Sequence, residues 1–162
     1  MEGEVVRDSI LAVGGMLDNT MFGAGTLDEN SVRRSIYFTV KRSQLVNSMV
    51  VFDAPEPLTS QGARPTTTVA PQALMLMNSP QVRRWAEAFA KRLNQEIPLP
   101  SDASLTPLIR HAYELALNRE PRASELQASE IFIRNGLPAG RDQALADFCQ
   151  TLFSLNEFSY SN

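Results

Sequence analysis

The sequence predicts a mainly α-helical fold, a compact antiparallel domain of about five to six helices with a small two-stranded β ribbon and a long irregular loop. Three observations support this prediction. Apolar residues recur every three or four positions over most of the chain, which is the spacing of one helix face. Short connections containing proline or glycine separate these stretches. One stretch, 34–42, alternates instead with the period of two that is typical of a strand.

Length and composition fit one globular domain. The chain has 162 residues, of which 43% are hydrophobic and 20% charged. We expect a single domain over 1–162, with a helix, loop and β ribbon arm in 1–65 and a helical core in 66–162. The first residues run directly into a helical pattern, so we also expect the chain to be a fragment of a longer protein.

The charge pattern argues against nucleic acid as a partner. The formal net charge is −3, and the basic residues are scattered instead of forming a stripe that could neutralise successive phosphates. No apolar run approaches the roughly 20 residues of a membrane-spanning helix, and the first residues lack the order of a secretory signal. We therefore predict no membrane span and no targeting signal in this chain.

The first third of the chain predicts one helix and the ribbon. Apolar spacing over 6–13 indicates a helix that ends at Gly14 and Gly15, and the polar, glycine-containing stretch 18–30 indicates a loop. The alternation over 34–42 indicates a strand, and the short apolar run 49–52 is a second strand that could pair with it.

The remainder predicts helices. Pro71 suits a helix start, and the residues that follow it are apolar on nearly every side, so 73–77 should be buried. Ser79 and Pro80 indicate the cap and first position of the next helix. Its apolar stripe, and those of the helices that follow, are spaced as in one helix face. These stripes are Val82, Trp85, Phe89 and Leu93; Leu108, Ile109, Ala112, Leu115 and Ala116; Leu126 and Ile133, ending at a left-handed Gly136; and Leu145, Phe148, Cys149, Leu152 and Leu155, from about Asp142.

Few residues suggest chemistry. Cys149 is the sole cysteine, which excludes an internal disulfide and a thiolate cluster, and its apolar neighbours predict a buried core residue. His111 is the sole histidine and has no catalytic partner in a recognisable motif, so we predict a place at the surface or core edge. The sequence contains no phosphate-binding glycine loop, metal-ligand spacing or haem-attachment motif, and we expect no catalytic residues, metal or cofactor.

The proline-rich segment from Phe52 onwards contains the candidate polar site. Asp53 and Glu56 could act as an acid and base pair, although an aspartate before Ala-Pro more often forms a turn. Arg64 and the threonines after it could cradle an anion or a sugar, or could fix the backbone and cap a helix. Gln72 and Asn78 are polar residues in apolar surroundings, and such residues must be hydrogen-bonded when they are buried, so they help to organise the fold. The candidate site comprises Asp53, Arg64, Thr66, Thr68, Gln72 and Asn78.

A series of short blocks resembles the PSD1 family, also called DUF1553, in its C-terminal part. The blocks are 7–13 (RDSILAV), 33–37 (RRSIY), 40–42 (VKR), 52–55 (FDAP), 71–74 (PQAL), 77–78 (MN), 116–121 (ALNREP) and 155–158 (LNEF). One departure is Arg122, where relatives often place Thr or Ser, so we expect the helix cap to shift to Ser124.

The resemblance implies a part of a large exported protein of planctomycetes and related bacteria, beside a PSCyt2 domain and often a c-type cytochrome domain. It implies an extracytoplasmic location and assigns no catalytic residue. We expect a non-catalytic helical interaction module whose partners are those other domains, with carbohydrate as a further candidate ligand. The alternative is a hydrolase acting on polysaccharide with Asp53, Glu56 and Arg64 in a cleft.

Overall fold

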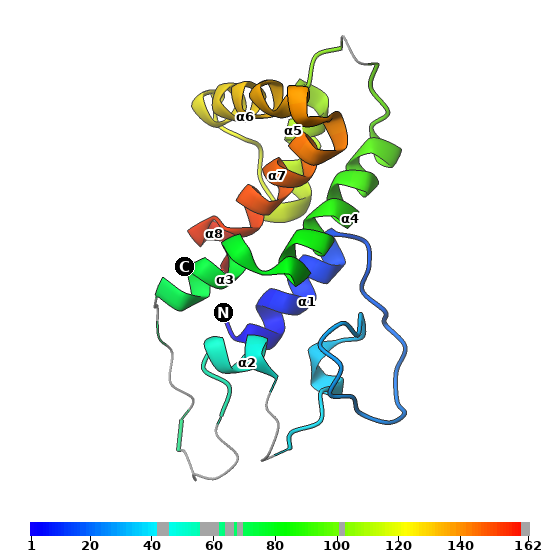
Figure 1. Ribbon diagram of the computed structural model, residues 1–162, viewed down its shortest axis with the longest axis vertical. Helices are drawn as coiled ribbons and strands as arrows, with labels where there is room; N and C mark the ends of the chain where they lie inside the picture. Colours follow the sequence, from blue (N-terminus) through cyan, green and yellow to red (C-terminus); the bar gives the residue numbers. More distant parts are fainter. Residues whose placement is uncertain (42–45, 56–61, 64–66, 68–69, 101–102, 160–162) are drawn as a thin grey trace.

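Figure 1 shows the fold in a computed structural model, which describes residues 1–41, 46–55, 62–63, 67, 70–100 and 103–159. Eight α-helices lie within these residues, so the predicted mainly helical fold is confirmed, with more helices than expected. At its centre α4 (Pro80–Glu96) packs against α7 (Arg141–Phe153) more extensively than any other pair of described helices. The other helices surround this pair.

The helix α4 forms as its sequence predicts. The Ser79 hydroxyl accepts a hydrogen bond from the Gln81 backbone N–H at 3.2 Å, and Pro80 occupies the first turn. The predicted apolar stripe is buried, with Trp85 5% and Phe89 0% exposed. This stripe is one half of the core, and α7 supplies the other.

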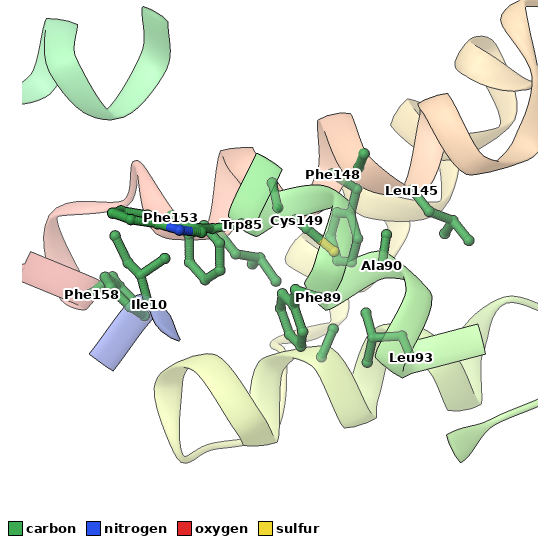
Figure 2. Close-up of a cluster of buried hydrophobic side chains, with 14 of the residues drawn as sticks. Ile10, Trp85, Phe89, Ala90, Leu93, Leu145, Phe148, Cys149, Phe153 and Phe158 are labelled. Carbon is green, nitrogen blue, oxygen red and sulfur yellow. The ribbon is translucent and has the colours of Figure 1, made fainter. Parts of the chain in front are cut away.

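Figure 2 shows how the aromatic side chains fill that core. The Phe89 and Phe153 rings stack with centroids 5.6 Å apart, and Phe158 tilts against Phe153 at 5.2 Å. Cys149 is buried among these residues, as predicted. Val6, Ile10 and Leu11 of α1 (Gly3–Val13) belong to the same cluster, together with buried residues of the helices that follow α4.

The predicted helices of the C-terminal half are confirmed as α5 (Thr106–Leu117), α6 (Ala123–Gly136) and α7, followed by the short α8 (Asn156–Ser159). Two details differ. Gly136 has a right-handed backbone with φ −80°, and the left-handed glycine after α6 is Gly140 at φ 117°. The cap of α6 is Arg122, whose backbone N–H donates to the Glu125 carboxylate at 2.7 Å, so the predicted shift to Ser124 is wrong.

The predicted β ribbon is wrong, because the described residues contain no β-strand; isolated bridges join Asp18 to Arg33 and Thr26 to Phe38. Over 34–41 the chain instead forms the 3₁₀ turn η1 (Ser35–Tyr37). The reason is a local anchor: the Asp8 carboxylate of α1 accepts hydrogen bonds from the Ser35 backbone N–H at 2.8 Å and hydroxyl at 2.7 Å. These bonds bend the chain where a strand would have to run straight.

The second predicted strand, 49–52, is also wrong, because this run lies mostly in the helix α2 (Asn47–Val51). Its β-branched residues favour a strand intrinsically, but packing overrides that preference. In the helical form Ser48, Met49 and Phe52 are buried beside α1. Gly3 of α1 permits this close approach, since a Cβ atom there would lie 2.7 Å from the Phe52 Cβ atom.

The helix α3 (Ala70–Asn78) exists as predicted, but the predicted burial of 73–77 is largely wrong. Leu76 is 3% exposed, whereas Leu74 is 55% and Met77 60% exposed. One face of α3 contacts α4, α7 and α2, and no described segment covers its opposite face. In Figure 1, α3 accordingly lies at the edge of the bundle.

Candidate functional site

A groove of about 800 Å³ opens between segments of the described residues. One wall is the outer face of α1, a second is the segment 34–40, and a third is α2 with residues 54 and 55. We call this hollow the α1–α2 groove. Most of its lining side chains are apolar, and several of them are unusually exposed: Val5 44%, Ile36 73%, Val40 74% and Val50 48%.

A network around Arg7 holds the groove walls together. Arg7 is 3% exposed and donates to the Arg33 carbonyl oxygen at 2.9 Å, to the Ser35 hydroxyl at 3.0 Å and to the Ser31 carbonyl oxygen. Its guanidinium lies 4.6 Å from the centre of the Phe38 ring. Burial lowers the pKa of Arg7, while the neighbouring Asp8 carboxylate opposes that shift. The segment 31–38 is therefore fixed to α1, which gives the groove a preformed wall.

A second charged network centres on Arg119, in the connection between α5 and α6. The Arg119 guanidinium binds both oxygens of Glu125, each at 2.8 Å, and both oxygens of Glu157, at 2.6 and 2.7 Å. These hydrogen bonds lower the pKa of Glu125 to about 2 and also lower the pKa of Glu157, since they stabilise the ionised carboxylates. The network connects the start of α6 to α8, so its charges serve the fold.

Of the predicted polar site, Asp53 forms a turn. It has a left-handed backbone with φ 59°, and its carboxylate accepts hydrogen bonds from the Thr67 backbone N–H at 2.7 Å and from the Thr67 hydroxyl at 2.8 and 2.9 Å. These hydrogen bonds connect the turn at Asp53 to a residue 14 positions further along the chain. Arg64, Thr66 and Thr68 lie outside the described residues, as does Glu56.

Gln72 and Asn78 are placed at opposite ends of α3. Gln72 is 4% exposed and its side-chain amide donates to the Val51 carbonyl oxygen at 3.1 Å, which fastens α3 to the end of α2. This position brings Gln72 near the turn that contains Asp53. Asn78 is exposed at the last residue of α3, about 9 Å along the helix from Gln72. The described part of the predicted site therefore gathers Asp53 and Gln72, and leaves Asn78 apart.

The sole histidine, His111, and the sole cysteine, Cys149, both have surroundings that indicate a role in the fold. The His111 ring nitrogen lies 2.6 Å from a Glu96 carboxylate oxygen, in a half-buried contact between α4 and α5, which is the core-edge position that was predicted. Cys149 is buried, and burial raises the pKa of its thiol, so it stays in the unreactive protonated form. Among the described residues no three His, Cys, Asp or Glu side chains are grouped to hold a metal.

The α1–α2 groove was missed in the sequence because its walls come from segments far apart in the chain. A signal was nevertheless present: Val5 lies off the apolar stripe of α1, and Ile36 and Val40 form one side of an alternating stretch that has no strand partner. Arg7 could also have been found. It lies one helical turn from Gly3 and Leu11, on the face of α1 that is buried.

A family model described as PSD1, protein of unknown function (DUF1553), matches residues 1–133. No curated protein and no solved structure is significantly similar to the chain. In the part of the chain that the structure describes, none of the helices combines the length and apolar character needed to cross a membrane.

Proposed function

The chain belongs to the PSD1 family of proteins of unknown function (DUF1553), and from this premise we propose that it is a non-catalytic interaction module. In this proposal it serves a large multidomain extracytoplasmic protein of planctomycetes or related bacteria. The partners are the other domains of the same polypeptide, the PSCyt2 and cytochrome c-like domains that the sequence resemblance implies. The module supplies a rigid surface on which one of those domains docks.

The observation that carries the proposal is the α1–α2 groove. Apolar side chains exposed together are costly in water, and soluble monomers rarely keep large contiguous patches of them unless they bind something. Ile36 and Val40 are each nearly three-quarters exposed, although a preformed network holds their segment in place. A wall that is both rigid and apolar suits docking, because little conformational entropy is lost on binding.

The shape of the groove favours an amphipathic helix as its occupant. The face that α1 turns toward the groove carries small side chains, Ser9 and Ala12, one and two turns beyond Val5. Small residues let a second helix approach to the usual interaxial distance of about 8–10 Å. Val40 and Val50 on the other walls would then contact the apolar side of that helix, as in other helix-in-groove complexes.

The hydrolase alternative is kept as a hypothesis without a supporting observation. Asp53 is engaged by Thr67 in a turn, and Glu56 and Arg64 lie outside the described residues. Carbohydrate binding at the candidate polar site likewise has no supporting observation. Most of the hydrogen-bond donors to a sugar would have to come from Arg64, Thr66 and Thr68, which lie outside the described residues. The apolar groove is consequently the better basis for a function.

Hydrogen exchange measured by mass spectrometry tests the proposal. Exchange of peptides covering 34–41 and 46–51 is compared between this chain alone and the intact parent polypeptide. We expect at least tenfold slower exchange in the parent, because the docked helix excludes water from both walls. Val50→Asp in the parent should abolish the difference, since it places a charge in an apolar contact.

The matched control is Ile131→Asp. Ile131 is 53% exposed on α6, similar to Val50 at 48%, but it lies outside the groove. It should leave the added protection unchanged. Equal exchange in the isolated chain and in the parent would refute the proposal, as would an equal effect of the two substitutions.

A further inference from the structure

A second, smaller cavity of about 120 Å³ lies where α1, α2, α3 and α4 meet. Most of its walls are buried apolar side chains, such as Ile10, Phe52 and Trp85. Polar side chains also line it, including Arg7 of α1 and Ser48 of α2. Met49 lines both this cavity and the α1–α2 groove, so α2 separates the two spaces.

Two polar atoms in the lining are buried without a hydrogen-bond partner among the described residues. They are the Nε atom of Arg7 and the hydroxyl oxygen of Ser48. The residues are 3% and 7% exposed, so bulk water does not reach them. Buried polar groups in folded proteins nearly always have a partner, and ordered water supplies it where protein does not.

The chemistry of the lining selects the partner. The Arg7 Nε–H group can only donate, whereas the Ser48 hydroxyl can donate or accept, so the ligand must accept from Arg7 and can do either with Ser48. An anion is disfavoured because Asp8 and Glu29 already surround the Arg7 guanidinium with negative charge. A cavity needs roughly 10–15 Å³ of free volume to hold one water molecule. Water therefore fits this site in size, charge and hydrogen-bonding capacity.

We propose that this cavity is a hydration site, in which ordered water molecules bind the Arg7 Nε–H group and the Ser48 hydroxyl and bridge α1 to α2. The proposal goes beyond the interaction module and does not depend on what occupies the groove.

The melting temperature of the Ser48→Ala variant tests the hydration site, because a hydrated and a dry cavity predict changes of opposite sign. If water binds the Ser48 hydroxyl, Ser48→Ala removes a hydrogen bond and leaves the water under-satisfied, so the melting temperature should fall by roughly 2–4 °C. If the site is dry, the same substitution removes an unsatisfied buried group, and the melting temperature should rise.

Ser159→Ala is the matched control. Ser159 also lies in a short helix, is 4% exposed, and has a hydroxyl without a partner among the described residues, but it lines neither cavity. We expect its alanine variant to be at least as stable as the natural chain. If Ser48→Ala and Ser159→Ala raise the melting temperature equally, the hydration site is refuted.

Crystals of the natural chain, measured before and after pressurisation with xenon, give an independent readout. We expect water density within hydrogen-bond distance of Arg7 Nε and the Ser48 hydroxyl, and no xenon in the cavity, since dry apolar cavities are the ones that take up xenon. Xenon density there, without water density, would overturn the proposal.

Discussion

At the scale of single residues, two arginines join segments that are distant in the sequence. Arg7 is buried and holds 31–35 against α1 through backbone carbonyl oxygens and Ser35. Arg119 is more accessible and clamps Glu125 and Glu157 with paired hydrogen bonds. Burial lowers the pKa of Arg7, whereas the two carboxylates raise the pKa of Arg119. Both guanidiniums remain charged.

Glu125→Gln should destabilise the chain at pH 7 and do so less at pH 3. The pKa of Glu125 is about 2 in the folded state, below the roughly 4.3 of an unfolded glutamate. Its stabilising effect is therefore present above the unfolded pKa and is lost as the pH falls toward 2. We expect a loss of about 1 kcal/mol in the free energy of unfolding at pH 7. Urea denaturation at both pH values measures it.

The control for this prediction is Glu130→Gln on the same helix. Glu130 pairs with Arg134 at 2.8 Å in an exposed i, i+4 contact, which contributes only a few tenths of a kcal/mol. An identical loss of stability for Glu125→Gln at pH 7 and pH 3 would contradict the proposed role of its ionised form.

At the scale of elements, the sequence predicted the helices well and the ribbon wrongly. The helix α4 was predictable because periodicity, capping residue and proline position agree, and α7 was predictable from its periodicity. The segments 34–42 and 49–52 have strand-like composition, but the Asp8 anchor and the burial of Phe52 override it, and both are tertiary effects. The exposed face of α3 was not predictable either, because apolar composition does not tell which neighbours are present.

Gly136→Ala should destabilise the contact between α6 and α7. Its backbone angles allow alanine, and alanine favours a helix by about 1 kcal/mol over glycine. However, the new Cβ atom would lie 2.9 Å from the Ala144 Cβ atom, and such overpacking costs about 1–3 kcal/mol. We expect a net loss of about 1 kcal/mol in chemical denaturation.

Ala144→Gly in the Gly136→Ala background provides the rescue. It removes the methyl group that the new side chain meets, so the double variant should be more stable than the sum of the single changes predicts. Strict additivity of the two substitutions would show that Gly136 is not needed for the close approach of the two helices.

At the scale of the whole molecule, the candidate sites were the least predictable part. Asp53 accepts a hydrogen bond from Thr67, and Gln72 donates one to the Val51 carbonyl oxygen, but their role in a binding site stays a prediction. The α1–α2 groove and the smaller cavity arise where several segments meet, and no single stretch of sequence encodes them. The shape of both spaces depends on how α2 packs against α1. The sequence predicted a strand, not a helix, where α2 lies.

Because one apolar cluster includes residues from α1 to α8, the chain should unfold as a single cooperative unit. Ile10→Ala at the N-terminal end of this cluster and Phe153→Ala near its C-terminal end should each cost roughly 2–5 kcal/mol. Both variants should shift one transition that Trp85 fluorescence and far-ultraviolet circular dichroism report at the same urea concentration. Two separate transitions, with Ile10→Ala moving one and Phe153→Ala the other, would mean that α1 and the C-terminal helices form independent cores.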